Sequence, residues 1–152
     1  MTDAAADTHR SVELTRIGEH RFKATNPRGG VLPIGEGEDP DFTPVELLLA
    51  AIAGCAAIDV DYITGKRSPA ASFDVHAAGE KVRDEDGNHL TDLQVVFDLT
   101  FPEGEAGDAA REVLQSAIER SRDRICTVSR TVALPTPVEM AQGSVERPGQ
   151  VT

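Results

Sequence analysis

The sequence predicts an α+β fold in which antiparallel strands accompany two helices. Pairs of strand-like segments joined by tight turns stand both before and after the middle of the chain. Between them, residues 47–58 are apolar on every side, and a later segment carries apolar residues at helical spacing. The predicted order, β-β-β-α-β-β-α-β, groups strands together instead of alternating each with a helix, which argues against a parallel sheet.

Length and composition limit the class of protein. The 152 residues suffice for one domain, placed at residues 11–141, with 1–10 and 143–152 as loose termini. A net charge of −11 argues against a nucleic-acid partner, because phosphate binding needs clustered Lys and Arg. The first residues lack the basic and apolar segments of a signal peptide. Because the longest apolar run is 12 residues, too short for a bilayer, we expect a cytoplasmic protein without a membrane partner.

The N-terminal part of the chain predicts three short strands. Residues 11–25 alternate around the turn Gly18-Glu19-His20, which is typical of a hairpin. Residues 26–30 form a turn, because proline fixes φ and the glycines permit positive φ. A third short strand is predicted at Val31–Ile34, before an acidic loop at residues 35–42.

The clearest helix begins at Thr43. Thr43 is a good N-cap, Pro44 suits the first helical position, and Glu46 lies three residues after the cap, where it completes a capping box. The residues that follow offer no polar face, and such a helix has to be buried on every side. In a domain of this size, the helix is therefore expected at the centre of the chain or shared with a second subunit.

The second half of the chain predicts another hairpin and another helix. Residues 72–83 and 90–102 flank the turn 84–88, whose Asp-Gly step is a strong hairpin signal. Asp108 is predicted to cap an amphipathic helix. A final strand is predicted at residues 131–140, where two prolines confine it to an edge.

The candidate chemistry rests on two cysteines. The sequence contains no phosphate-binding loop and no nucleophile-elbow motif, and its four histidines lack ligand spacing, so we expect no cofactor and no metal. Cys55 lies in the apolar helix, where cysteine is most often a small hydrophobic residue. Cys126 lies near Arg122, Arg124 and Arg130, which either favour a thiolate or simply suit the end of a helix.

Two segments taken together resemble the OsmC/Ohr family, which contains osmotically inducible protein C and the organic hydroperoxide resistance proteins. They are the Pro-x-Glu-Leu-Leu-Leu-Ala-Ala helix of residues 43–55, ending in Cys55, and the Cys-x-Val-Ser of residues 126–129, about seventy residues later. The resemblance implies an OsmC-like fold with antiparallel sheets packed around a central apolar helix. It also implies an intertwined homodimer with active sites at the subunit interface.

The activity that the resemblance implies is that of a thiol peroxidase acting on organic hydroperoxides. Cys55, as a thiolate, would attack the O–O bond and become a sulfenic acid. Cys126 would condense with it to a disulfide, and an external dithiol or lipoyl-type reductant would restore both thiols.

The resemblance also implies an arginine that activates the thiolate and a glutamate that holds this arginine. Arg28 is the candidate arginine, with Arg21 as its rival. Val45 occupies the position of the family glutamate, and Glu46, the remaining candidate, lies one residue later. The helix therefore resembles an OsmC-like branch more than the well-marked peroxidases. For that branch, the alternative is a weakly catalytic or non-catalytic protein that binds a small apolar or thiol-bearing ligand at the dimer interface.

Overall fold

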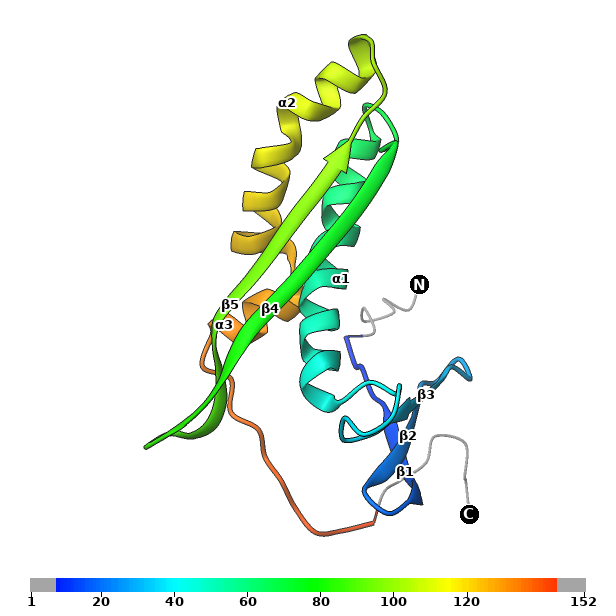
Figure 1. Cartoon of the computed structure of the whole chain (residues 1–152), viewed down its shortest axis with the longest axis vertical. Helices are drawn as coiled ribbons and strands as arrows, with labels where there is room; N and C mark the ends of the chain where they lie inside the picture. The colour runs from blue at the N-terminus through cyan, green and yellow to red at the C-terminus, as the bar shows by residue number, and fades with distance from the viewer. Residues whose placement is uncertain (1–7, 145–152) are drawn as a thin grey trace, which may run out of the picture.

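A long apolar helix and a long β-hairpin lying beside it dominate the molecule (Figure 1). The computed structural model describes residues 8–144, so the parts of the predicted loose termini at residues 1–7 and 145–152 lie outside the described residues. The elements in chain order are β1 (Glu13–Gly18), β2 (Arg21–Thr25), β3 (Val31–Ile34), α1 (Pro44–Gly65), β4 (Ser72–Asp84), β5 (Gly87–Thr100), α2 (Glu105–Arg120), the π-helical turn η1 (Ser121–Ile125) and α3 (Thr127–Ala133).

The first three strands form a small antiparallel sheet, as the sequence predicts. β1 pairs with β2, and β2 pairs with β3, with Phe22 opposite Ile34. The sheet lies at the N-terminal end of α1, away from most of the hairpin and from α2 (Figure 1). Its main contacts are among its own strands. Apolar side chains such as Leu14 and Leu32 are therefore 55% and 39% exposed.

α1 begins where the sequence predicts. The Thr43 backbone N–H donates to the Glu46 carboxylate at 2.9 Å, and the Glu46 N–H donates to the Thr43 hydroxyl at 3.2 Å, which completes the capping box. One side of α1 packs against α2, α3 and β4. The buried residues on that side recur every four positions and are Ile52, Ala56, Val60 and Thr64.

The opposite side of α1 is exposed within one chain, whereas the sequence predicts a helix that is buried on every side. Leu48, Ile58 and Tyr62 are 38%, 60% and 73% exposed. α1 has 22 residues and therefore extends beyond the apolar run of 12 residues seen in the sequence. By length and hydropathy alone, such a helix could cross a membrane. Its packing against three other elements is that of a core helix with one side left open. A second protein surface can cover this side.

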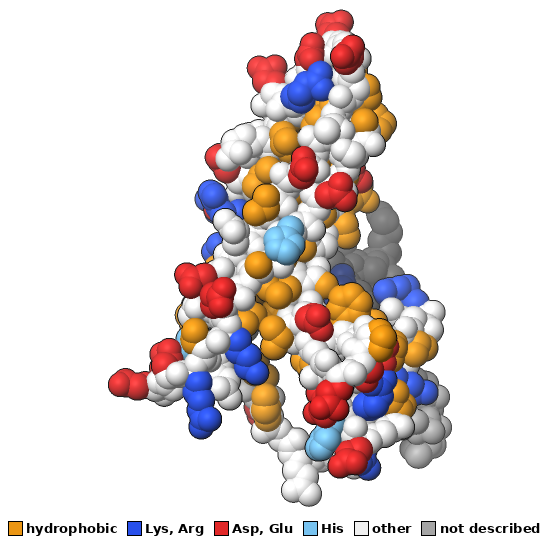
Figure 2. Space-filling view, in the orientation of Figure 1, with side chains coloured by type: hydrophobic (Ala, Val, Ile, Leu, Met, Phe, Trp, Pro, Cys, Tyr) orange, Lys and Arg blue, Asp and Glu red, His pale blue; other side chains and the backbone are white. Residues whose placement is uncertain are grey.

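β4 and β5 form the predicted hairpin, and it is longer than predicted. Pairing runs from Ser72 opposite Thr100 to Asp84 opposite Gly87, right up to the turn, where Gly87 has a φ of 94°. An isolated two-stranded sheet is marginally stable, and here α1 supports it. Figure 2 shows hydrophobic side chains along the middle of the visible face and acidic ones towards its top.

The C-terminal part of the fold corrects two predictions. α2 begins at Glu105 after Gly104, whose φ of 113° favours glycine, so Asp108 lies in the first turn and pairs with Arg111 instead of capping the helix. Residues 127–133 form α3 instead of the predicted final strand at 131–140. The Cys126 sulfur caps α3 by accepting the Ser129 N–H, and the helix ends just before the first proline of this segment.

Replacing Gly107 with alanine should destabilise the protein strongly. A Cβ built at this position lies 1.7 Å from the Pro102 carbonyl oxygen, so backbone has to move. Such overpacking costs about 1–3 kcal/mol and occasionally more. Gly65→Ala is the matched control, because a Cβ at Gly65 meets nothing within 4 Å. Urea unfolding measures both variants, and equal midpoints would contradict the clash.

Candidate active site

The fold brings the two cysteines of the chain together. Cys55 is the twelfth residue of α1 and is half-buried, whereas Cys126 lies between η1 and α3 and is fully buried. The two sulfur atoms lie within 4.8 Å of each other, and both thiols are free. Because a disulfide requires an S–S distance of about 2.0 Å, side-chain rotation has to close the remaining gap.

The π-helical turn positions Cys126. The Cys126 N–H donates to the Ser121 carbonyl at 2.9 Å, which closes the wide turn and directs the chain back towards α1. The sulfur accepts the Ser129 N–H at 3.4 Å and donates to the Ser129 hydroxyl at 3.2 Å. π-Helical turns are rare and often occur at functional sites. The fold thus holds this sulfur in one orientation.

Asp59 is a third member of the site, which the sequence analysis missed. Its carboxylate lies one helical turn after Cys55 and within 4.8 Å of both sulfur atoms. The Ser121 hydroxyl donates a hydrogen bond of 2.9 Å to Asp59 Oδ2. The signal available in the sequence was the spacing of four residues, which places Asp59 and Cys55 on the same side of α1.

The surroundings of Cys55 disfavour its thiolate. Burial is the main factor that raises the pKa of the Cys55 thiol, and the neighbouring Cys126 and Asp59 raise it further. A hydrogen bond from the Val128 backbone opposes them and lowers the pKa. Within residues 8–144, no arginine contributes to this balance. A cation from elsewhere would therefore be needed to favour the thiolate.

Replacing Asp59 with asparagine should lower the pKa of Cys55. The change removes a negative charge that opposes thiolate formation, while burial, the larger effect, stays. The alkylation rate of Cys55 should therefore increase at neutral pH. Mass spectrometry measures this rate at a series of pH values, with a chelator present to exclude metal ions. Asp61→Asn is the control, because Asp61 is exposed on the same helix. An unchanged pH profile for Asp59→Asn would contradict the electrostatic role of Asp59.

An apolar hollow of about 440 Å³ adjoins the cysteine site. Ser129, which bonds the Cys126 sulfur, is part of its wall, as is Ala56, the neighbour of Cys55. Arg122 also lines this hollow, and its guanidinium is paired with Asp123. Leu48 lines a separate apolar hollow at the start of α1. The remaining lining residues are Ile52, Leu93, Val95, Phe97, Ile118, Val132 and Ala133.

Comparison with known families identifies the chain. The family model described as OsmC-like protein matches residues 35–141, which include α1, both cysteines and α3. The chain belongs to the OsmC-like family. This OsmC-like protein is also 31% identical over 129 residues to uncharacterized proteins of Mycobacterium bovis and Mycobacterium tuberculosis. The match covers 84% of this chain and 91% of theirs.

Solved structures show the same fold. An OsmC-like protein of unknown function from Vibrio cholerae superposes with a TM-score of 0.69 at 13% identity, covering 85% of this chain and 95% of that one. An organic hydroperoxide resistance protein OsmC from Legionella pneumophila gives a TM-score of 0.56 at 12% identity, covering 84% and 91%. The α+β class with antiparallel sheets is therefore confirmed, and residues 8–144 contain three α-helices instead of the two predicted.

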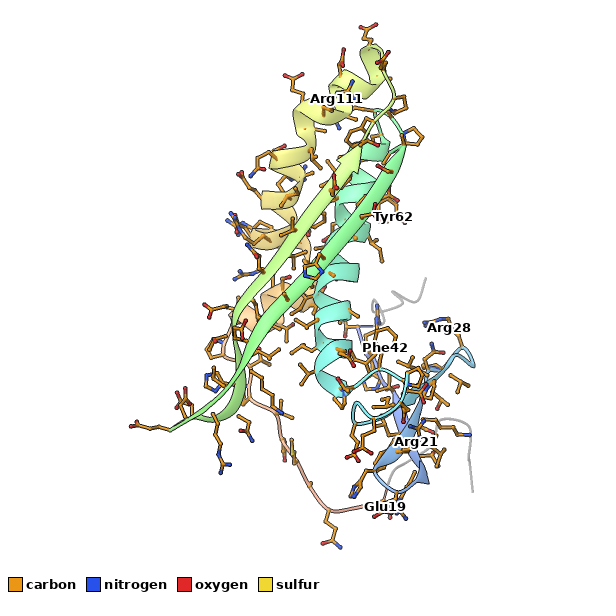
Figure 3. The ribbon with its side chains drawn as sticks, viewed as in Figure 1. Glu19, Arg21, Arg28, Phe42, Tyr62 and Arg111 are labelled. Carbon is orange, nitrogen blue, oxygen red and sulfur yellow. The ribbon has the colours of Figure 1, made fainter. Side chains whose placement is uncertain are left out.

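The other predicted site residues lie elsewhere in the chain of this OsmC-like protein. Arg28 is exposed in the turn between β2 and β3 (Figure 3). Glu46 is engaged in the capping box at the start of α1, nine residues before Cys55. Arg21, the rival candidate, forms ion pairs with Asp39 and Asp41. Within one chain, the fold thus brings Cys55 and Cys126 together and leaves Arg28 and Glu46 at the N-terminal end of α1.

Proposed function

We propose that this protein reduces organic hydroperoxides through a two-cysteine mechanism. The proposal rests on one observation above all, the approach of the Cys55 and Cys126 sulfur atoms to within 4.8 Å as free thiols. Membership of a family whose fold is shared with a hydroperoxide resistance protein supports it. Cys55 is the attacking residue because it is the more accessible of the two.

The reaction divides into two steps. The Cys55 thiolate attacks one oxygen of the hydroperoxide, which breaks the O–O bond, oxidises the sulfur to a sulfenic acid and releases an alcohol after protonation. The Cys126 sulfur then attacks the Cys55 sulfur, which forms the disulfide and releases water. A dithiol or lipoyl-type reductant restores both thiols by exchange. The hydrogen bonds to Ser129 hold the Cys126 sulfur ready for the second step.

The apolar hollow favours an organic hydroperoxide as the substrate. Its lining is mostly aliphatic and aromatic, and it reaches the two residues that adjoin the sulfurs, Ala56 and Ser129. Burial of apolar surface contributes roughly 25 cal/mol per Å², so an alkyl or aryl group gains affinity that hydrogen peroxide cannot gain. We therefore expect cumene hydroperoxide to react faster than hydrogen peroxide.

The active form is proposed to be a homodimer. The open side of α1 and the apolar side chains of the three-stranded sheet both need a cover that one chain does not supply. A second copy of the chain can cover both at once. Because no arginine of residues 8–144 acts on Cys55 within one chain, Arg28 is proposed to favour the thiolate of the partner subunit instead.

Exchange of Arg28 for alanine should slow the reaction with cumene hydroperoxide on the order of a hundredfold, as expected when a positioned catalytic group is lost. It should also raise the pKa of Cys55, since a cation favours the thiolate. Arg122→Ala is the comparison, because Arg122 lines the hollow within the same chain. If only Arg122→Ala slows the reaction, Arg122 and not Arg28 activates the thiolate.

One experiment tests the proposed function directly. Reduced, metal-free protein is mixed with one equivalent of cumene hydroperoxide, and both peroxide and free thiol are followed. We expect both to disappear together, with peptide mapping showing a Cys55–Cys126 disulfide. Intact peroxide beside a Cys55 that is still readily alkylated would overturn the proposal in favour of a ligand-binding protein with the same hollow.

A further inference from the structure

The site described above contains a third ligand-type side chain that the peroxide reaction does not use. The Asp59 carboxylate and the sulfurs of Cys55 and Cys126 all lie within 4.8 Å of one another. Two of these residues come from adjacent turns of α1, and the third comes from the junction of η1 and α3. Three donor atoms from separate parts of the chain thus lie close together.

Only one oxygen of the Asp59 carboxylate accepts a hydrogen bond from the described residues. Ser121 donates to Oδ2, but among the described residues nothing donates to Oδ1 and no Lys, Arg or His forms an ion pair with this carboxylate. Oδ1 of Asp59 and the two sulfur atoms together offer donor atoms of the kinds that bind divalent metal ions. The geometry therefore points to a cation rather than to a purely structural contact.

We propose that the reduced protein binds a divalent cation of the Zn²⁺ type through Cys55, Asp59 and Cys126. Binding forms two metal–sulfur bonds and one metal–oxygen bond, and the two thiol protons pass to solvent without any change in oxidation state. Thiolates select Zn²⁺ over Mg²⁺ and Ca²⁺, which prefer sites made of oxygen alone. The site does not depend on peroxide reactivity.

The distances suit this ion after small side-chain rotations. Zn²⁺ holds sulfur at about 2.3 Å and carboxylate oxygen at about 2.0–2.2 Å, so the donors of one tetrahedral site lie roughly 3.5–3.8 Å apart. The three atoms here are within about an ångström of that spacing. Three protein ligands leave the fourth position for water or a ligand.

A second layer of residues fixes the donors. The Ser121 hydroxyl orients the Asp59 carboxylate at 2.9 Å, and the Ser129 N–H orients the Cys126 sulfur at 3.4 Å. Such partners of metal ligands typically contribute 10- to 100-fold to metal affinity. Ser121 is itself fully buried, so its hydroxyl has little freedom to turn away.

Metal binding to the full chain, reduced with a phosphine and stripped of metal, tests the proposal. Zn²⁺ is titrated in competition with a chromophoric chelator, and Co²⁺ is used as a spectroscopic probe. We expect one ion per chain and a thiolate-to-Co²⁺ charge-transfer band. Cys126→Ser should weaken this band, and Asp59→Asn should lower Zn²⁺ affinity by at least about tenfold while the band remains. Ser121→Ala should lower the affinity about 10- to 100-fold.

Matched variants separate this site from adventitious binding. Asp61→Asn removes an exposed carboxylate from the same helix and should bind Zn²⁺ like wild type. Asp59→Glu keeps the charge and should still bind the metal, with a shifted Co²⁺ spectrum. This variant tests the site even if the Asp59→Asn protein does not fold. Wild-type affinity in both Asp59→Asn and Ser121→Ala, or no stoichiometric binding at all, would overturn the proposal. Because the peroxide assay uses metal-free protein, its outcome tests the proposed function independently of metal binding.

Discussion

Serine at position 55 should abolish the consumption of organic hydroperoxide. The sulfur of Cys55 is the proposed nucleophile, and a serine hydroxyl at this half-buried position has no comparable tendency to ionise or to attack an O–O bond. Cys126→Ser should behave differently. It should still consume one equivalent of peroxide and then stop, because the sulfenic acid at Cys55 has lost its partner within 4.8 Å.

Mass spectrometry after dimedone treatment checks these two outcomes. The Cys126→Ser protein should carry one adduct at Cys55, whereas wild type should carry none and should contain the disulfide. Ser129→Ala is a useful third variant, because it removes the hydroxyl contact to the Cys126 sulfur while leaving both thiols in place. If Cys126→Ser blocks the first turnover and Cys55→Ser does not, the two cysteines have exchanged roles.

Lysine in place of Ile58 should convert the proposed dimer into monomers. Ile58 lies on the open side of α1 with 60% of its surface exposed in one chain. In a two-fold dimer the same surface is used by both subunits, so one substitution places two ammonium groups in the interface. Such an unpaired buried charge costs several kcal/mol, and each 1.4 kcal/mol weakens association about tenfold.

Light scattering at micromolar concentration measures the change in mass. Val138→Lys is the control, because Val138 is 77% exposed in the segment after α3 and lies on none of the helices or strands. It should leave the mass of wild type unchanged. A wild-type protein that is monomeric under these conditions would contradict the dimer. So would an Ile58→Lys protein that keeps the dimeric mass.

Local signals predicted most of the elements, because those signals lie within a few residues of each structure that they specify. The Thr43 cap, with Pro44 and Glu46 after it, placed the start of α1 correctly. The Asp-Gly step placed the long hairpin, although pairing continues to Gly87. The start of α2 was misplaced because Asp108 resembles a cap, whereas the glycine before Glu105 has the conformation that begins the helix.

The C-terminal segment shows where local signals fail. Residues 131–140 alternate and contain β-branched side chains, which favoured a strand. The chain instead forms α3, because the π-helical turn carries Cys126 back against α1 and its sulfur supplies the cap. A cap formed by a cysteine sulfur is not a pattern that helix-start rules include.

The class of fold, the family and the two cysteines on which the proposed chemistry depends can all be recognised from the amino-acid sequence. Each of these follows from residue types at fixed spacing along the chain. Which side chains come into contact depends on the packing of the folded chain. It joined Cys126 and Ser121 to Asp59 across more than sixty residues, and it left Arg28 and Glu46 at the far end of α1. Sequence spacing specifies which residues are neighbours within one helix, whereas contacts between helices depend on how their buried sides pack.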